Sequence, residues 1–300
     1  MPCGKVVAEE SERQPDSIEI LKRNARKSEL PEDWEKVIEM ANARHDTADL
    51  GLAYVSYFQS LNNMNRDEGF MTDVYPALTF LSDTKQYDYY FALYNMLVNR
   101  LFSHRFYQKA QDEAADMYLQ AKKLQQPLGM AMALRVQGQI YYKLNLYDKA
   151  YASLQEGREI CPSYQKNLNT FMTAQSLCEW LIMTCIKTEA FEELLSLADH
   201  YGDMLAYWNE KGWYDPSGHC PVTYHSLRSI AFLKVDRVSE AQDCLEKARE
   251  YMRPEFPARA YEHFYEACYM YMYEKGEYKE AIAQVDTLME THRDYFPFLL

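Results

Sequence analysis

One stretch of the chain, from Ala131 to Tyr164, limits the possible folds more than any other. Its apolar and small residues recur at spacings of three and four, which places them on one face of each of two successive helices. Asn145 and Leu146 lie between these helices, and Pro162 ends the second because proline lacks an amide proton and clashes with the preceding turn. The first face holds Leu134, Gly138 and Tyr141, and the second holds Tyr147, Ala150, Leu154 and Gly157.

Two small residues in this stretch predict that the helices cross closely. Gly138 lies on the first helix and Ala150 on the second. Antiparallel helices approach closely only where the side chains at the crossing are small. The stretch therefore predicts a tight helical hairpin.

The same hairpin recurs along the chain from Phe91 onward. Its second helix opens on an aromatic or apolar residue that is followed, three positions later, by alanine or once by leucine. The last residues of these phrases lie 40, 44, 47 and 40 positions apart (150 − 110, 194 − 150, 241 − 194 and 281 − 241). Such spacing predicts an irregular array of helical repeats. The phrases are Tyr107–Ala110, Tyr147–Ala150, Phe191–Leu194, Val238–Ala241 and Tyr278–Ala281.

The stretch from Ala131 to Tyr164 resembles the tetratricopeptide repeat at the Leu, Gly, Tyr, Tyr, Ala, Leu and Pro positions of that family's pattern. It departs at Gly157, where the family usually has alanine. The resemblance implies an all-α fold, a right-handed alpha-alpha superhelix (solenoid) of about five to six hairpins, each packed only against its neighbours. Because the family repeat has about 34 residues, the wider spacing here implies linkers or lengthened helices.

We expect one repeat domain over residues 16–300, preceded by a flexible leader over residues 1–15. An insertion from Asn209 to Pro221 cannot be helical throughout, because glycine and proline interrupt it. The expected hairpins cover residues 91–124, 131–164, 175–208, 222–255 and 262–295.

Charge and composition exclude several classes of partner. The net charge of −13 repels nucleic acid backbones and anionic lipid headgroups. No apolar run reaches the roughly 20 residues that cross a bilayer. The seven cysteines are odd in number and scattered, which argues against a disulfide framework and weakly favours the cytoplasm. Otherwise the sequence leaves the compartment unknown.

The family resemblance also implies ligand-facing positions on the first helix of each hairpin. Asparagine and glutamine carboxamides there can pair with the main chain of an extended peptide, and Arg135 can take a carboxylate. The alternative is that a solvated inner face is polar in any case. The positions that we select as ligand contacts are Asn95, Asn99, Arg135, Gln139, Tyr142, Glu179, His263 and Glu266.

The family's clamp for an acidic C-terminal tail is disfavoured. That clamp needs lysine at the position of Asn95 and cations in the third hairpin, where this chain has Glu179. We therefore expect a protein or peptide partner of another kind.

Metal, cofactor and catalytic sites are not expected. His219, Cys220 and His225, with His200 and Asp215, lack the paired spacing of a zinc site. The group Glu262, His263 and Glu266 is more typical of a solvated charge cluster than of an acid–base pair. The chain has no glycine-rich phosphate loop, nucleophile elbow or His-Glu-x-x-His motif.

These observations favour a non-catalytic peptide- or protein-binding module. Two phrases, Tyr87–Tyr94 and Met130–Tyr141, also resemble the repeat-containing sensor regions of Bacteroidetes histidine kinases, which implies a periplasmic sensing part of a larger signalling protein. The alternative is a scaffold that self-associates through the end of the solenoid, since Phe296, Phe298 and Leu299 form an apolar terminus.

Overall fold

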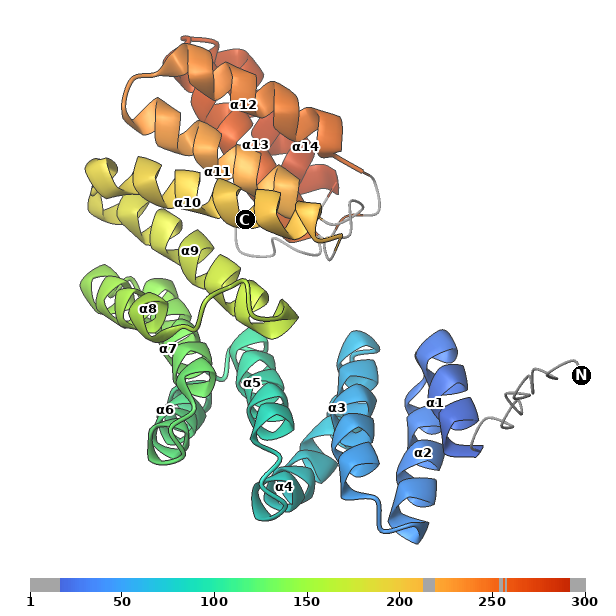
Figure 1. Cartoon of the computed structure of the whole chain (residues 1–300). Helices are drawn as coiled ribbons and strands as arrows, with labels where there is room; N and C mark the ends of the chain where they lie inside the picture. The colour runs from blue at the N-terminus through green and yellow to red at the C-terminus, as the bar shows by residue number, and fades with distance from the viewer. Residues whose placement is uncertain (1–16, 213–218, 254–255, 257, 292–300) are drawn as a thin grey trace, which may run out of the picture. The chain divides into compact units, whose positions relative to one another are not determined.

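The structure is a computed structural model that describes residues 17–212, 219–253, 256 and 258–291. The described residues form fourteen α-helices and no strand, so the all-α prediction is confirmed (Figure 1). The fourteen described helices exceed the ten to twelve that five to six hairpins would contain. The expected leader lies outside the described residues.

The chain divides into two compact units, residues 1–104 and 105–300. In unit 1 each helix packs on the next, and α3 also packs on α5. The single domain expected over residues 16–300 remains a prediction, and the expected hairpin 91–124 has its two helices in different units. Unit 1 contains α1 (Ser17–Ser28), α2 (Pro31–Ala43), α3 (Thr47–Asn63), α4 (Asp67–Asp83) and α5 (Tyr87–Ser103).

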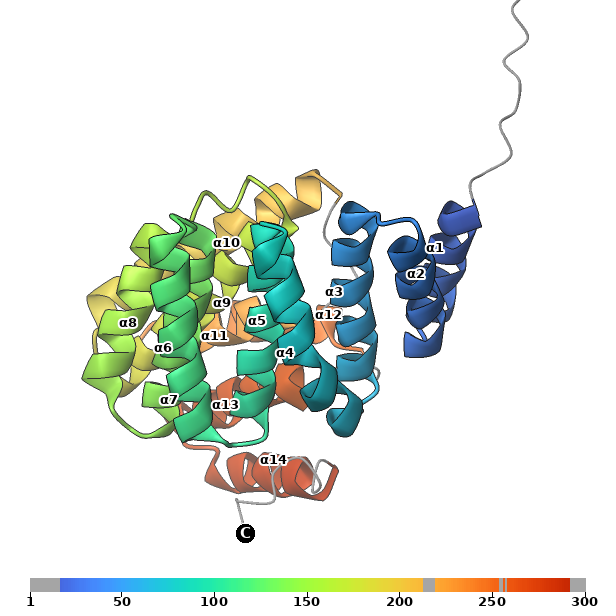
Figure 2. The ribbon, with the colours of Figure 1, turned by 90° about the horizontal axis from the view of Figure 1, so that it is seen from below.

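Unit 2 contains the nine remaining described helices, and they pack neighbour to neighbour (Figure 2). The odd-numbered helices α7, α9, α11 and α13 also pack on one another in that order, so they form a continuous row. The helices are α6 (Tyr107–Lys123), α7 (Pro127–Lys143), α8 (Tyr147–Ile160), α9 (Leu168–Thr188), α10 (Phe191–Glu210), α11 (Cys220–Lys234), α12 (Val238–Tyr251), α13 (Ala258–Glu274) and α14 (Tyr278–Thr291).

The small residues at the start of each second helix are buried. Ala110, Ala150 and Ala241 are fully buried, and Ala281 is 8% exposed. Leu194 takes the same place in α10 and is also fully buried. The positions that index the repeat are therefore packing positions.

Gly138 marks the closest approach within the α7–α8 hairpin. A Cβ atom at Gly138 would lie 2.4 Å from Leu154 Cγ and 3.3 Å from the backbone oxygen of Ala150. The departure from the family pattern at Gly157 has a similar cause, because a Cβ atom there would lie 2.9 Å from Leu177 Cδ2 of α9. Leu177 thus fills space that an alanine at position 157 would need.

Lengthened helices explain the repeat spacing in the middle of the chain. Helices α3 to α7 have 17 residues each. They are separated by short turns in which one residue has a positive φ angle, and these residues recur every 20 positions (65 − 45, 85 − 65, 105 − 85, 125 − 105 and 145 − 125). A pair of such helices spans 40 residues. The turn residues are His45, Asn65, Lys85, Arg105, Gln125 and Asn145.

We expect Gly138→Leu to destabilise unit 2 by about 1 to 3 kcal/mol, because the added side chain overpacks the crossing. Urea unfolding followed by tryptophan fluorescence measures this, since Trp180 and Trp208 lie on α9 and α10 of unit 2. In a double-mutant cycle, Gly138→Ala and Leu154→Ala should cost less together than the sum of their separate effects. Additive costs would contradict the clash with Leu154.

We expect Gln125→Gly to stabilise unit 2 by about 0.5 to 1 kcal/mol, since a left-handed conformation strains every residue with a Cβ atom. Gln125 has a φ angle of 54° and follows α6, where its amide donates to the carbonyl of Lys122. The matched control is Gln120→Gly inside α6, which should destabilise by about 1 kcal/mol. The same urea titration compares both variants, and a loss of stability in Gln125→Gly would refute the argument.

Candidate functional site

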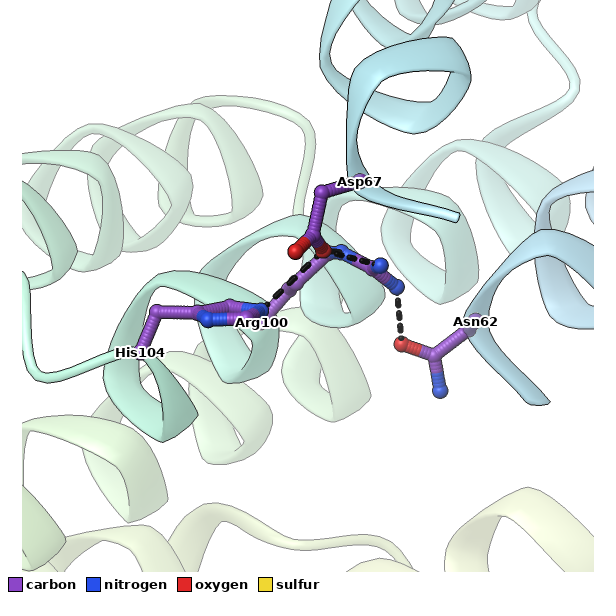
Figure 3. A network of polar contacts seen from close by, with 4 residues as sticks. All are labelled: Asn62, Asp67, Arg100 and His104. Atoms are coloured by element: carbon purple, nitrogen blue, oxygen red, sulfur yellow. Dashed lines mark hydrogen bonds and ion pairs between the residues drawn. The ribbon is translucent and has the colours of Figure 1, made fainter. Parts of the chain in front are cut away.

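A polar network in unit 1 is built around Arg100 of α5 (Figure 3). The Arg100 residue is 4% exposed, and its Nε donates to Asp67 Oδ1 at 2.6 Å. Its Nη2 also donates to Asp67 Oδ1, and Nη1 donates to Asn62 Oδ1 at 2.9 Å. The guanidinium lies over the Phe70 ring, with Cζ 4.8 Å from the ring centroid. The network therefore fixes the Asn62 carboxamide.

Asp67 balances the charge of Arg100. His104 Nε2 lies 3.1 Å from the same Asp67 oxygen. Burial acts to raise the pKa of Asp67, but hydrogen bonding to Arg100 and the Arg100 charge outweigh it, so the pKa lies below its ordinary value. The carboxylate is therefore ionised at neutral pH and cancels one positive charge.

A hollow of about 290 Å³ lies beside this network, within unit 1. Asn99, which the sequence predicted as a ligand contact, lies in its wall. Asn99 Nδ2 donates to the main-chain oxygen of Asn95 at 2.6 Å and to Asn95 Oδ1 at 3.0 Å, so these two predicted contacts lie together. The hollow is lined by Asn62, Asn65, Met96, Asn99, Arg100, Ser103 and His104.

The other six predicted contacts belong to unit 2, and four of them are buried. Arg135 is 8% exposed, Gln139 4%, Glu179 3% and His263 2%. Their side chains pack where the odd-numbered helices contact one another along this row. Their role as ligand contacts stays a prediction.

Glu179 belongs to a buried hydrogen-bond network. It accepts from Tyr201 Oη at 2.7 Å and from Gln175 Nε2 at 2.9 Å. Gln175 Nε2 also lies 3.2 Å from Cys220 Sγ. This network links α9 with α10 and with the start of α11.

Tyr142 and Glu266 are only partly buried. The Tyr142 ring packs edge-on against Trp180, with 5.3 Å between centroids. Burial raises the pKa of Tyr142, and the charges of Glu266 and Glu262 raise it further, so α13 carboxylates act on this hydroxyl. Glu266 Oε2 lies 4.0 Å from His263 Nδ1, which has no hydrogen-bond partner among the described residues.

His225 is one of the residues considered above for a zinc site. His225 of α11 is partly buried and stacks on Tyr251, with 5.8 Å between ring centroids. Among the residues that the structure describes, no group of three or more His, Cys, Asp and Glu side chains could hold a metal ion. Asp215 lies outside the described residues.

No described helix is both long and apolar enough to span a membrane.

Sequence reasoning missed Arg100 and Asp67. One signal was present, because Arg100 interrupts an apolar stripe of α5 that contains Leu93, Leu97 and Leu101. A charged residue among buried positions indicates a buried partner. Its partner came from α4, more than 30 residues earlier, so helix periodicity alone could not identify it.

Comparison with known proteins supports the fold. No known protein-family profile matches the sequence, and no curated protein matches it. The crystal structure of BtubC (BKLC) from P. vanneervenii aligns with a TM-score of 0.55 and 15% identity over 78% of this chain and 91% of that chain. An alignment with the APC/C hetero-tetramer Cut9-Hcn1 covers 91% of this chain and 65% of that chain, with a TM-score of 0.29 and 13% identity.

The BtubC alignment agrees with the fold described above, a helical-repeat array in which helices pack neighbour to neighbour. The consecutive helix pairs and the buried small residues agree with the repeat pattern.

We expect His225 to make unit 2 less stable as pH falls. Burial, followed by the charges of Lys247 and Arg228, lowers the pKa of His225 to about 4. The unfolded chain, with a histidine pKa of about 6.5, therefore binds more protons between pH 6.5 and 4, and the free energy of unfolding falls with pH across that window. From pH 7 to pH 5 the loss due to His225 should be about 1 to 2 kcal/mol.

Urea titrations of wild type and His225→Phe at both pH values measure this loss. Phenylalanine keeps a ring on Tyr251 and cannot titrate, so the variant should lose less stability than wild type. Equal losses in the two proteins would show that His225 binds its proton equally in both states.

Proposed function

We propose that this chain is a non-catalytic module that binds a protein or peptide segment. The tetratricopeptide-like fold suggests a protein-interaction role, because its rigid helices present side chains without ordering on binding. The single observation that supports a specific site is the hollow in unit 1, whose wall contains three asparagines. The net charge of −13 disfavours nucleic acid as the partner.

The chemistry of the hollow suits a peptide main chain. A carboxamide offers a donor and an acceptor, as a peptide group does. Arg100 occupies Asn62 Oδ1 and leaves the Asn62 amide group directed away from the guanidinium. Because Asp67 neutralises Arg100, the hollow is polar with little net charge, which favours neutral peptide groups over a free anion.

The six predicted ligand contacts in unit 2 have two different roles in this proposal. Tyr142 and Glu266 are partly exposed and would contact a partner segment that binds to unit 2 itself. Arg135, Gln139, Glu179 and His263 are buried and would support the helices that carry them. Arg135 Nη1, for example, lies 3.5 Å from Ser176 Oγ of α9.

A ligand-sensing role within a larger signalling protein is a narrower form of the proposal, supported by the two sequence phrases alone. Self-association is the second candidate. Exposed apolar side chains on α13 and α14 favour it, since Tyr273 is 61% exposed, Tyr278 56% and Ile282 62%. Such side chains can bury one another between two copies.

Selection of peptides from a random 12-residue display library against the whole chain tests the proposal. Selected peptides should bind in fluorescence anisotropy, and Asn62→Ala and Asn99→Ala should each weaken binding by about tenfold through lost hydrogen bonds. Light scattering of the same samples reports self-association.

The matched control is Asn63→Ala. Asn63 is exposed on α3 next to Asn62 but does not line the hollow. It should bind as tightly as wild type. Equal binding by all three variants would remove the hollow from the site, and a concentration-dependent dimer with no selected peptide would favour the second candidate.

A further inference from the structure

A second, smaller cavity lies in unit 2, where the turn after α8 meets α9 and α10. Its volume is about 110 Å³, well below the roughly 300 to 1,000 Å³ of pockets that hold whole small molecules. It can therefore hold one functional group of a larger partner. The walls that matter for its chemistry come from Arg158, Cys161, Ser163, Tyr164, Cys178 and His200.

Arg158 makes this cavity electropositive. Its side chain is half-buried near the end of α8, and it forms no hydrogen bond or ion pair with any other residue that the structure describes. Its positive charge acts on the Cys178 thiol, which faces the same cavity. A half-buried cation that makes no direct ion pair has lost part of its hydration, so an anion in the cavity would be stabilised.

The other residues that line the cavity do not supply that anion. Burial raises the pKa of Cys161 to about 11 and that of Cys178 to about 12, so both thiols are neutral at pH 7. Asp199, adjacent to His200, is engaged by Arg228 Nη2 at 2.9 Å. No aspartate or glutamate is among the described residues that line the cavity.

The part of the wall formed by Tyr164 is held in place. Trp208 Nε1 donates to the main-chain oxygen of Tyr164 at 3.2 Å. The Tyr164 ring packs edge-on against His200 and Tyr207, at centroid distances of 6.0 and 5.6 Å. Ser163 Oγ accepts from the Gln165 amide at 3.3 Å, which leaves its hydroxyl proton available to a ligand. The cavity is thus shaped before any ligand enters.

We propose that this cavity binds a carboxylate, either an acidic side chain or a chain terminus, that a protein partner inserts beside Arg158. A guanidinium binds a carboxylate through two parallel hydrogen bonds, and the Ser163 hydroxyl adds a third donor. One cation matches the single negative charge of a carboxylate better than the two charges of a dianionic phosphate. The assignment of the carboxylate to a protein rests on the proposed binding function; the preference of the cavity for carboxylates does not.

Alkylation of Cys161 tests this preference on the whole chain. Iodoacetate and iodoacetamide react in the same way, since the thiolate sulfur bonds to their CH₂ carbon and iodide leaves, but only iodoacetate carries a carboxylate. Mass spectrometry of digested protein gives the two rates at each cysteine. The ratio of the iodoacetate rate to the iodoacetamide rate should be at least about tenfold higher at Cys161 than at Cys220, which is also partly buried but lies outside the cavity.

Variants and competitors decide the outcome. Arg158→Gln should lower the ratio at Cys161 to that at Cys220, and Arg158→Lys should keep part of it. In wild type, acetate should slow the reaction of Cys161 with iodoacetamide, whereas acetamide and sodium chloride at equal concentration should not. The competition measurement uses only the wild-type protein, so its result does not depend on whether a variant folds.

An equal ratio at both cysteines, or no protection by acetate, would overturn the proposal. Stronger protection by inorganic phosphate than by acetate would overturn the assignment to a carboxylate. Neither result depends on the hollow in unit 1, so failure here is distinguishable from failure of the peptide-binding proposal.

Discussion

Close approach of helix backbones is the constraint on which the rest of unit 2 depends. At Gly138 the neighbouring Leu154 side chain occupies the volume that a Cβ atom would need. At Gly157 the Leu177 side chain of the next hairpin does the same. One glycine therefore closes the α7–α8 pair, and the other fits that pair to α9. Because neighbours interlock at both points, each added hairpin finds its position from the previous one.

The same close packing explains why polar side chains are buried along the row formed by α7, α9, α11 and α13. Helices that nest through small residues bring their polar positions together, and a charged group there must find a partner. Glu179 accepts hydrogen bonds from Tyr201 and Gln175. Arg100 in unit 1 donates hydrogen bonds to Asp67 and Asn62. Arg158 is the contrast, since it faces a cavity, and this difference separates a structural cation from a candidate binding group.

The sequence predicted the helices well because their signals are local. Periodicity predicted an all-α chain of successive helices, as the described residues show, and Ala150 and Ala281 are buried as the pattern required. The pattern could not predict which of the selected polar residues are buried. The burial of Gln139 and His263 depends on how neighbouring hairpins meet, and no spacing within one helix reports that. Asn99 lies in the wall of the hollow in unit 1, and its role as a ligand contact stays a prediction. Arg100 pairs with a residue of α4, which the periodicity of α5 could not identify.

The regular turns of the middle region have a consequence for how such a chain changes its length. A left-handed residue recurs every 20 positions from His45 to Asn145, between helices of equal length. Removal or duplication of forty residues between two such turns therefore deletes or adds one whole helix pair. The helices that follow then keep the same face directed inward. Gain or loss of one residue inside one of these helices instead rotates the rest of that helix by about 100°. Whole pairs are thus the natural unit of insertion here.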